Sequence, residues 1–329
     1  MPSAVLDVPT LETLISAAVT APSIHNTQPW RFRLDTDTVT LQIRAVSDRG
    51  LRHTDPVGRA LHLSVGCAVL NLRVAITQFG WEPVTRLLPQ PDQPDLLAAI
   101  RLGGLVRGSF PGLYDALWRR HSSRFPFSER PLPAAVLAEL TEAAHSEGAA
   151  LTHLSRAETD RVLRLTGDAE RRNVIDHDRA AESSRWVRAK DGTGLGIPPE
   201  ALGPRDFREI VPVRDFSARR TPDRLPARPF EKRPAIAVLS TLHDGRRDWL
   251  RAGQALQRVL LVATAHGIRA SLLHQALEWP DMRRQLVSST ATGPAHAHMV
   301  IRLGYGPEGS PSPRRRTTAL PHPQPPISC

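Results

Sequence analysis

Apolar positions along the chain recur with two different periods, and these periods predict where helices and strands lie. Between residues 61 and 79 the apolar side chains fall three and four positions apart, which places them on one face of a helix. Around 30–43 apolar and polar side chains alternate on both sides of Asp35-Thr36-Asp37, which is typical of a β-hairpin. The short run AIAVLST at 235–241 is apolar almost throughout, as expected of a buried strand. The chain therefore predicts a mixture of helices and strands.

The other predicted elements follow the same two patterns. We expect further helices at 9–20, 114–121, 133–146 and 158–185, and further strands at 82–88, 98–105, 150–154 and 296–304. Residues 191–232 are rich in Pro, Gly and Arg and show no clear period. So long an irregular stretch in a compact chain is either functional or mobile.

Two of the predicted helical segments resemble each other. GCAVLNLRVAITQFG runs from Gly66 to Gly80, and GQALQRVLLVATAHG runs from Gly253 to Gly267, so both pairs of glycines have the same spacing. The closing glycine is typical of a helix C-terminus in the left-handed conformation. Two related halves, each built on one buried central helix, explain this repeat.

Length and composition fit two globular halves and exclude several classes of protein. The chain has 329 residues, of which 40% are hydrophobic and 23% charged, as in an ordinary folded protein. The net charge of +10 comes from dispersed arginines with only 5% aromatic residues, which argues against a nucleic-acid surface. Two cysteines cannot form a disulfide framework and favour a reducing cytoplasm. No apolar run approaches the ~20 residues that span a bilayer, and no signal peptide is evident.

Candidate chemistry begins in the polar loop APSIHNTQPW at 21–30. Short hydrogen-bonding side chains gather there, at Ser23, Asn26, Thr27 and Gln28, beside main-chain amides. Such a set suits the polar edge of a planar heterocycle. The alternative is a plain connector that Trp30 anchors to the core.

Two further motifs carry arginines. RRHSSR at 119–124 can present guanidinium groups and hydroxyls to a phosphate, although a solvated basic helix end has the same composition. LGYG at 303–306, followed by PRRR at 313–316, could complete an anion site or could be a basic tail. Taken together, the loop and the arginines supply what a flavin mononucleotide (FMN) needs.

These motifs also carry a family resemblance. APSIHNTQPWRF resembles the signature loop of the FMN-dependent nitroreductase family, RHSSRFPF resembles its Arg-x-Ser-x-Arg/Lys motif, and LGYG with PRRR resembles its C-terminal strand and phosphate-binding arginines. Here the Arg-x-Ser motif follows the loop instead of preceding it, an order similar to the Acg subfamily, in which two nitroreductase-like halves are fused. The helices around both repeat segments are Acg-like as well, so the resemblance covers nearly the whole chain.

The resemblance implies an α+β fold with α/β/α layers, mixed and mostly antiparallel sheets, and a pseudo-dimer of two tandem halves. Residues 1–112 would supply the flavin-ring loop, and residues 113–329 would supply the phosphate site, a candidate lid at 191–232 and a basic C-terminal tail. One complete FMN site would then lie between the halves.

The resemblance also implies the residues of that site. The phosphate would be held by Arg120 and by Arg314 or Arg316, and the phosphate–ribityl region by His121 and Ser122. Arg124 would face the N1/O2 edge, and the main chain near His274 and Gln275 would face N5. The residues that flank the ring would be Pro22, Ser23, Ile24, Asn26 and Gln28. Because FMN itself performs hydride transfer, no acid–base dyad is required, and none is evident in the sequence.

The implied activity is NAD(P)H-dependent reduction of quinone or nitro-type acceptors by hydride transfer through FMN N5, with NADH or NADPH as electron donor. An FMN-binding or storage protein with an occluded flavin is one alternative, and a biosynthetic flavin oxidase or dehydrogenase is another. No metal-ligand, nucleotide-binding or serine-hydrolase motif occurs, so no metal is expected. The expected partner is a small molecule, with neither nucleic acid nor membrane, and the fusion favours a monomer.

Overall fold

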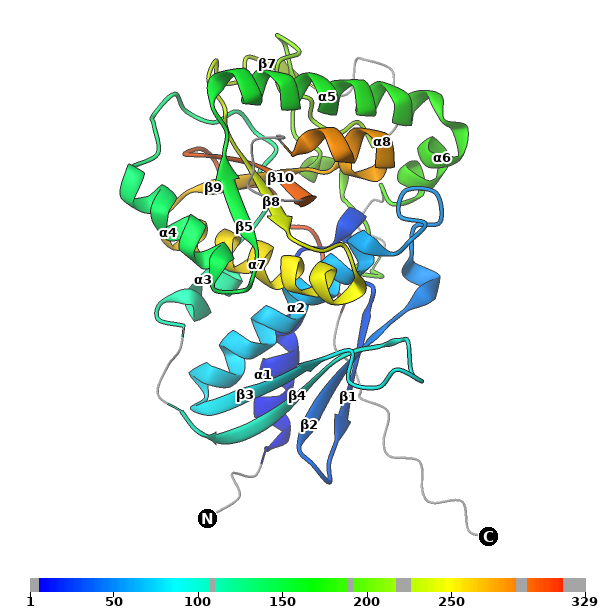
Figure 1. Cartoon of the computed structure of the whole chain (residues 1–329), viewed down its shortest axis with the longest axis vertical. Coiled ribbons are helices and arrows are strands. Elements are labelled where there is room, and N and C mark those ends of the chain that lie inside the picture. Colours follow the sequence, from blue (N-terminus) through cyan, green and yellow to red (C-terminus); the bar gives the residue numbers. More distant parts are fainter. Residues whose placement is uncertain (1–5, 107–109, 188–191, 217–225, 288–294, 316–329) are drawn as a thin grey trace.

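The computed structural model describes residues 6–106, 110–187, 192–216, 226–287 and 295–315, and it has two lobes that meet at a central pair of helices (Figure 1). The first lobe contains α1 (Val8–Val19), β1 (Trp30–Asp35), β2 (Thr40–Ala45), α2 (Arg59–Gln78), β3 (Trp81–Leu87) and β4 (Leu96–Leu105). Its four strands form an antiparallel sheet in the order β1-β2-β4-β3. The predicted hairpin is confirmed, with Trp30 opposite Ala45 and Asp35 opposite Thr40.

The second lobe is built in the same way around another antiparallel sheet. Its elements are α3 (Leu113–Arg119), α4 (Ala134–His145), β5 (Ala150–His153), α5 (Arg156–Ile175), α6 (His177–Arg185), β8 (Ala235–Thr241), α7 (Arg246–Ala265), β9 (Arg269–Leu273), α8 (Pro280–Arg283) and β10 (His296–Gly304). The strand order is β5-β8-β10-β9. The predicted mixture of helices and mostly antiparallel sheets is therefore confirmed.

Several short elements connect these layers. They are the 3-10 turns η1 (Ile24–Asn26), η2 (Ser47–Arg49), η3 (Pro199–Ala201), η5 (Gln275–Glu278) and η6 (Arg284–Leu286), and a two-stranded parallel pair of β6 (Arg205–Asp206) and β7 (Ala227–Arg228). The described part of the 191–232 stretch contains little other regular structure, as its composition predicts.

One helix that the sequence predicts as continuous is two helices in the structure. The polar segment expected to form a single helix over 158–185 forms α5 and α6, which meet at Asp176. Asp176 leaves the helical conformation at ψ 107°, and its carboxylate accepts a hydrogen bond from the Arg179 N–H, so it caps the start of α6. The strand β9 follows the closing Gly267, where the sequence indicates only a short β-like or polar stretch, because a five-residue run directly after a helix carries little periodicity.

The two repeat helices, α2 and α7, cross at their opening glycines. A Cβ on Gly66 would lie 2.3 Å from the Leu250 carbonyl oxygen, and a Cβ on Gly253 would lie 2.2 Å from the Leu63 carbonyl oxygen. These contacts are reciprocal, and the Gly66 Cα would lie only 2.9 Å from the added Cβ of Gly253. Only glycine allows the helix backbones to come this close. The closing glycines, Gly80 and Gly267, adopt the expected positive φ of 88° and 70°.

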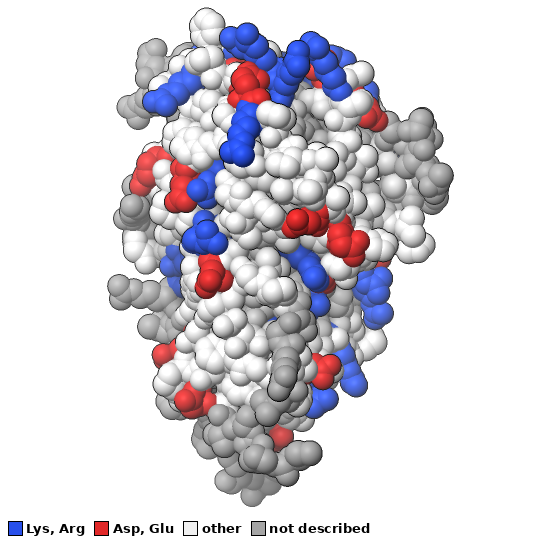
Figure 2. Space-filling view, turned by 90° about the vertical axis from the view of Figure 1, so that its left-hand side faces the viewer, with Lys and Arg blue, Asp and Glu red and all other residues white. Residues whose placement is uncertain are grey.

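The helix α2 is central to the core and is buried along most of its length. By length and composition it is apolar enough to cross a membrane, but 83% of the apolar window lies inside the folded protein, as in the core helix of a globular fold. On the face shown in Figure 2, basic and acidic side chains are interspersed over the surface. That face therefore carries no continuous basic surface of the kind that binds nucleic acid.

Candidate functional site

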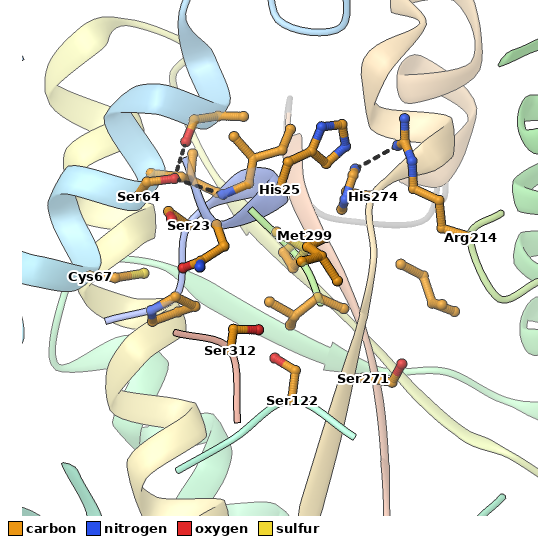
Figure 3. A pocket seen from close by; sticks show the side chains of 18 of the residues that line it. Ser23, His25, Ser64, Cys67, Ser122, Arg214, Ser271, His274, Met299 and Ser312 are labelled. Atoms are coloured by element: carbon orange, nitrogen blue, oxygen red, sulfur yellow. Dashed lines mark hydrogen bonds between the residues drawn. The ribbon is translucent and has the colours of Figure 1, made fainter. Parts of the chain in front are cut away.

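A cavity of about 1260 Å³, part of it open to solvent, is lined by residues of both lobes. The first lobe contributes the loop after α1 and the N-terminal half of α2. The second lobe contributes the segment after α3, strand β9 with the turn after it, the described 192–216 segment and the C-terminal segment near Ser312 (Figure 3). Convergence of several elements on a single large cavity is typical of a cofactor or substrate site.

The loop after α1 has an unusual backbone. His25, Asn26 and Gln28 have φ values of 49°, 53° and 47°, in the left-handed region that residues other than glycine rarely adopt. Long-range and local hydrogen bonds hold the loop, because the Ile24 N–H donates to Ser64 Oγ at 3.2 Å and the Gln28 N–H donates to Ser23 Oγ at 3.0 Å. Backbone strain of this kind clusters at functional sites, where the surrounding fold maintains it.

One end of the cavity contains buried positive charge without a negative partner. Arg120, Arg124 and Arg314 all line the cavity, and none of them forms an ion pair with a carboxylate among the described residues. Burial lowers the pKa of Arg120 and of Arg124 to about 10, and that of Arg314 to about 9. A buried charge is costly unless it is paired, so the end with Arg120 and Arg314 favours an anion, whereas Arg124 lies toward Arg214 and His25.

The guanidinium groups of Arg120 and Arg314 differ in how many hydrogen bonds they make to the protein. Arg314 donates to the carbonyl oxygens of Val19, Thr20 and Ala21 and to Asn26 Oδ1, so its donors are largely taken and its contribution to an anion is charge. Arg120 donates from Nη2 to the Thr20 carbonyl at 3.0 Å, whereas its buried Nε has no partner. Arg120 lines the cavity and makes no other side-chain hydrogen bond among the described residues, so its guanidinium retains donors for a ligand.

The predicted phosphate motif and the C-terminal segment meet at this end of the cavity. The Ser123 N–H donates to the Ala270 carbonyl at 2.9 Å, which ties the motif to β9, and Ser123 Oγ donates to the Pro307 carbonyl at 3.0 Å. A Cβ on Gly309 would lie 1.9 Å from the Ser122 carbonyl oxygen, so the C-terminal segment lies directly against the motif. Ser122 and Ser312 both line the cavity and are labelled in Figure 3.

Most of the predicted site residues line this cavity. They are Pro22, Ser23, Ile24, Asn26, Arg120, His121, Ser122, Arg124, His274 and Arg314. Gln28 and Gln275 do not line it: Gln28 Nε2 donates to the Gly194 carbonyl, and Gln275 Nε2 donates to the Pro212 carbonyl at 3.0 Å. Both side chains donate to main-chain oxygens of the 192–216 segment, whereas the expectation for Gln275 concerned its main chain. Arg316 lies outside the described residues.

The opposite end of the cavity holds a polar cluster that the sequence analysis missed. His274 Nδ1 lies 2.6 Å from Glu278 Oε1, and Arg214 Nη1 donates to the same Glu278 oxygen and lies 3.2 Å from His274 Nδ1. The buried His25 ring lies 5.8 Å from the His274 ring, and neither of its nitrogens has a hydrogen-bond partner among the described residues. Figure 3 shows His25, His274 and Arg214 grouped on one side of the cavity.

No acid–base dyad is evident in the sequence, whereas the structure brings His274 and Glu278 together as a pair of that type. His274 and Glu278 stand four residues apart in the sequence HQALE, on the turn η5. Burial alone would raise the pKa of Glu278, but Arg214 and His274 together lower it, so the group is a carboxylate. Burial lowers the pKa of His274, although Glu278 opposes this shift. In the sequence, the only signal for this pair was the four-residue spacing of His274 and Glu278. That spacing brings two side chains together only where the chain forms a helical turn, which the sequence did not reveal here.

The same cluster could supply metal ligands, since one atom each of His25, His274 and Glu278 lie within 4.8 Å of one another. Arg214 argues against this use. Its guanidinium contacts the same carboxylate, and a second arginine, Arg124, also lies close enough to lower the pKa of His25. The two guanidinium groups would repel a cation bound here, but they would not repel a neutral or anionic molecule.

The described 192–216 segment lies over the cavity. Ile197, Val213, Arg214 and Phe216 all line it. The segment is tied to the loop after α1, because Asn26 Nδ2 donates to the Gly196 carbonyl at 2.8 Å and Gln28 Nε2 donates to the Gly194 carbonyl at 2.6 Å. Further side chains bond to this segment, among them Gln275 to the Pro212 carbonyl and Arg124 to the Ala201 carbonyl, so it is held over the cavity at several points.

Comparison with known proteins identifies relatives along nearly the whole chain. A Mycobacterium tuberculosis H37Rv protein named "Putative NAD(P)H nitroreductase Rv3131" is 32% identical over 319 residues, which cover 95% of this chain and 91% of that protein. The protein named "Putative NAD(P)H nitroreductase acg" from the same organism is 30% identical over 314 residues, which cover 94% and 92%. No family model matches the chain.

Solved structures similar to this fold include a nitroreductase with bound FMN from Bacteroides fragilis, at 15% identity and a TM-score of 0.37 over 65% of this chain and 98% of that one. Another is the FMN- and NADPH-dependent nitroreductase NfnB, at 17% identity and a TM-score of 0.38 over 61% and 94%. The identities to the two mycobacterial proteins extend over both lobes and the cavity between them. By this full-length similarity, the chain belongs to the nitroreductase family and is a relative of the mycobacterial Acg protein.

Proposed function

We propose that this protein is an FMN-dependent oxidoreductase that binds one flavin in the cavity between the lobes. The observation that carries the proposal is the group of three buried arginines, Arg120, Arg124 and Arg314, which face one cavity without a carboxylate partner among the described residues. A phosphate monoester supplies the missing negative charge. The names of the relatives and the FMN in the similar structures support the same choice.

The residues present fit FMN. Arg120 would donate to the phosphate through its free nitrogen, Arg314 would add charge, and Ser122 and Ser312 would offer hydroxyls beside them. The ring would lie against Ser23 and Ile24 and the helix α2, with Arg124 toward its electron-rich N1/O2 edge, where a cation stabilises negative charge. When bound, FMN supplies hydride transfer, and these residues bind and orient it.

The proposal also includes an electron donor, an electron acceptor and an origin for the two halves of the chain. NADH or NADPH would donate electrons, and a small molecule of the quinone or nitro type would accept them. Residues 1–112 and 113–329 would correspond to two subunits of an ancestral dimer, because α2 and α7 meet through reciprocal glycine contacts. A chain that contains both halves can act as a monomer, and its buried free thiol Cys67 suits a reducing cytoplasm.

The decisive experiment is to purify the protein and record its absorption. We expect a flavin band at about 450 nm that bleaches within seconds when NADH or NADPH is added without oxygen. Heat denaturation should release FMN, which is identified by its fluorescence and mass. A colourless protein that takes up no added FMN would contradict the proposal.

A second candidate function is flavin storage without reductase turnover, and the covering segment favours it. Arg214 and Phe216 occupy one side of the cavity, where a nicotinamide or an acceptor would have to approach. If this segment stays closed, the protein would remain yellow when NADH or NADPH is added. The two functions therefore differ in whether the 192–216 segment opens.

Gln28→Ala tests this difference. The substitution removes the hydrogen bond to the Gly194 carbonyl and the one that Gln28 Oε1 accepts from the Arg315 N–H, whereas Gln28 itself does not line the cavity. We expect the variant to keep its flavin and to be reduced by NAD(P)H several-fold faster than the wild type, with stronger quenching of flavin fluorescence by iodide. Thr38→Ala on the exposed β1–β2 turn is the control. Equal rates and equal quenching in both proteins would show that this contact does not limit access.

A further inference from the structure

The end of the cavity opposite Arg120 and Arg314 contains an imidazole whose neighbours fix the position of its proton. His274 Nδ1 lies 2.6 Å from Glu278 Oε1, and the Glu278 group is a carboxylate. Because a carboxylate only accepts, the shared hydrogen must reside on Nδ1, and Nε2 then keeps its lone pair. His274 Nε2 has no hydrogen-bond partner among the described residues, and His274 lines the cavity.

Several hydrogen bonds and ion pairs fix the Glu278 carboxylate, so it can orient the His274 ring. Arg214 Nη1 donates to Glu278 Oε1, and Asn173 Nδ2 donates to Glu278 Oε2 at 2.9 Å. Arg214 Nη2 also donates to Ser183 Oγ at 3.0 Å, and Arg179 Nη1 lies 3.8 Å from Glu278 Oε2. A carboxylate with this many partners orients an imidazole as in other acid–base dyads.

The groups that face His274 define what it can meet. They are Glu278, Arg214, Arg124 and the buried His25, whose two ring nitrogens are unpartnered. The Phe216 ring lies edge-on to His25 with 5.2 Å between the ring centroids, and Met299 also lines the cavity. Aromatic and thioether walls beside free imidazole nitrogens suit a flat aromatic molecule that carries a hydroxyl or a carbonyl oxygen.

We propose that His274 is a catalytic residue that exchanges a proton with a quinone-type substrate, and that Glu278 and Arg214 are its positioning residues. This inference rests on the proposed flavin site, because it assigns the second proton of a reaction whose hydride comes from reduced FMN. It also selects quinones over acceptors that take electrons alone.

Reduction of a quinone to a hydroquinone requires two electrons and two protons. A hydride brings two electrons and one proton to the quinone, and the remaining oxygen needs one more proton to give the hydroquinone. Because burial lowers the pKa of His274, the resting imidazole is neutral and its Nε2 first takes up a proton from solvent. The Glu278 carboxylate stabilises the imidazolium, which then gives the Nε2 proton to that oxygen and returns to the neutral Nδ1–H form. In the reverse direction, the neutral Nε2 takes the hydroxyl proton of a hydroquinone.

The first measurement is the tautomer of His274 and does not depend on turnover. In FMN-loaded protein labelled with ¹⁵N-histidine, NMR should show His274 protonated on Nδ1 and not on Nε2. In Glu278→Gln the carboxylate is lost, and we expect a mixture of both tautomers. A wild-type His274 protonated on Nε2 would overturn the proposal, because no lone pair would then face the cavity.

The second measurement compares two oxidants after photoreduction of the bound flavin, so that no nicotinamide is needed. Menadione needs a proton and ferricyanide does not. We expect His274→Ala to lower the menadione rate on the order of 100-fold and to leave the ferricyanide rate within about two-fold. Added imidazole should restore part of the menadione rate, and Glu278→Gln should lower the same rate less. The matched control is His153→Ala, a half-buried histidine on β5 that does not line the cavity.

The outcomes separate this inference from the proposed function. A wild-type protein without bound FMN would contradict the proposed function itself. A flavin-loaded wild type that menadione does not reoxidise would contradict only the substrate class inferred here. Equal losses with both oxidants in His274→Ala, or no loss with menadione, would show that His274 has a structural role and would overturn the assignment.

Discussion

Arg120→Ala is expected to lower the affinity for FMN on the order of 100-fold, because a charge-assisted contact to the phosphate is worth roughly 1.5–3 kcal/mol. Arg120 is buried, its Nε is unpartnered, and no carboxylate neutralises it among the described residues. The measurement is a titration of flavin-free protein with FMN, followed by quenching of flavin fluorescence. The flavin-free variant should be no less stable than the wild type, since the substitution removes a buried unpaired charge.

The neighbouring Arg119 supplies the matched control. It is exposed on the last turn of α3, so Arg119→Ala removes the same charge from the surface and should leave FMN affinity within about two-fold. Undiminished affinity in Arg120→Ala would show that the phosphate binds elsewhere. A large drop in the melting temperature of the flavin-free variant would instead assign Arg120 to the C-terminus of α1, where it bonds to the Thr20 carbonyl.

Gly253→Ala should have the second large effect, on folding. The added Cβ would lie 2.2 Å from the Leu63 carbonyl oxygen and 2.9 Å from the Gly66 Cα, so α2 and α7 would have to separate. Overpacking of this kind costs about 3 kcal/mol, more than the gain in helix propensity. Chemical denaturation with far-UV circular dichroism would measure the loss. FMN binding should weaken as well, because Leu63 on α2 and Leu256 on α7 line the cavity.

Gly167→Ala is the control for this substitution. Gly167 also lies within a helix, α5, but its added Cβ would meet only Arg171 and Pro212 at 3.8 and 3.9 Å, which are ordinary contacts. We expect it to raise the free energy of unfolding by roughly 0.5–1 kcal/mol, as glycine to alanine does inside a helix. If Gly253→Ala were equally harmless, the close crossing of α2 and α7 would be refuted.

The sequence by itself determined most of the elements and one end of the site. Periods of about 3.6 and 2 residues are local, so the helices around 61–79 and 253–267 and the hairpin at 30–45 could be placed from apolar spacing alone. The loop at 22–28 and the arginine motifs were also recognisable, because each is a short continuous segment. The repeat correctly predicted a left-handed glycine at the end of both central helices.

The opposite end of the site was decided only by the tertiary structure. His25, Arg214 and His274 come from a strained loop, an aperiodic segment and a turn after β9, and no local pattern links them. Their proximity depends on how α2 and α7 pack and on how the 192–216 segment folds over the cavity. The same packing directs the Gln28 and Gln275 side chains toward main-chain oxygens, although Gln28 stands inside the loop motif. Spacing along the chain fixes which face of an element a side chain occupies, whereas burial, pairing and partners arise only when distant elements meet.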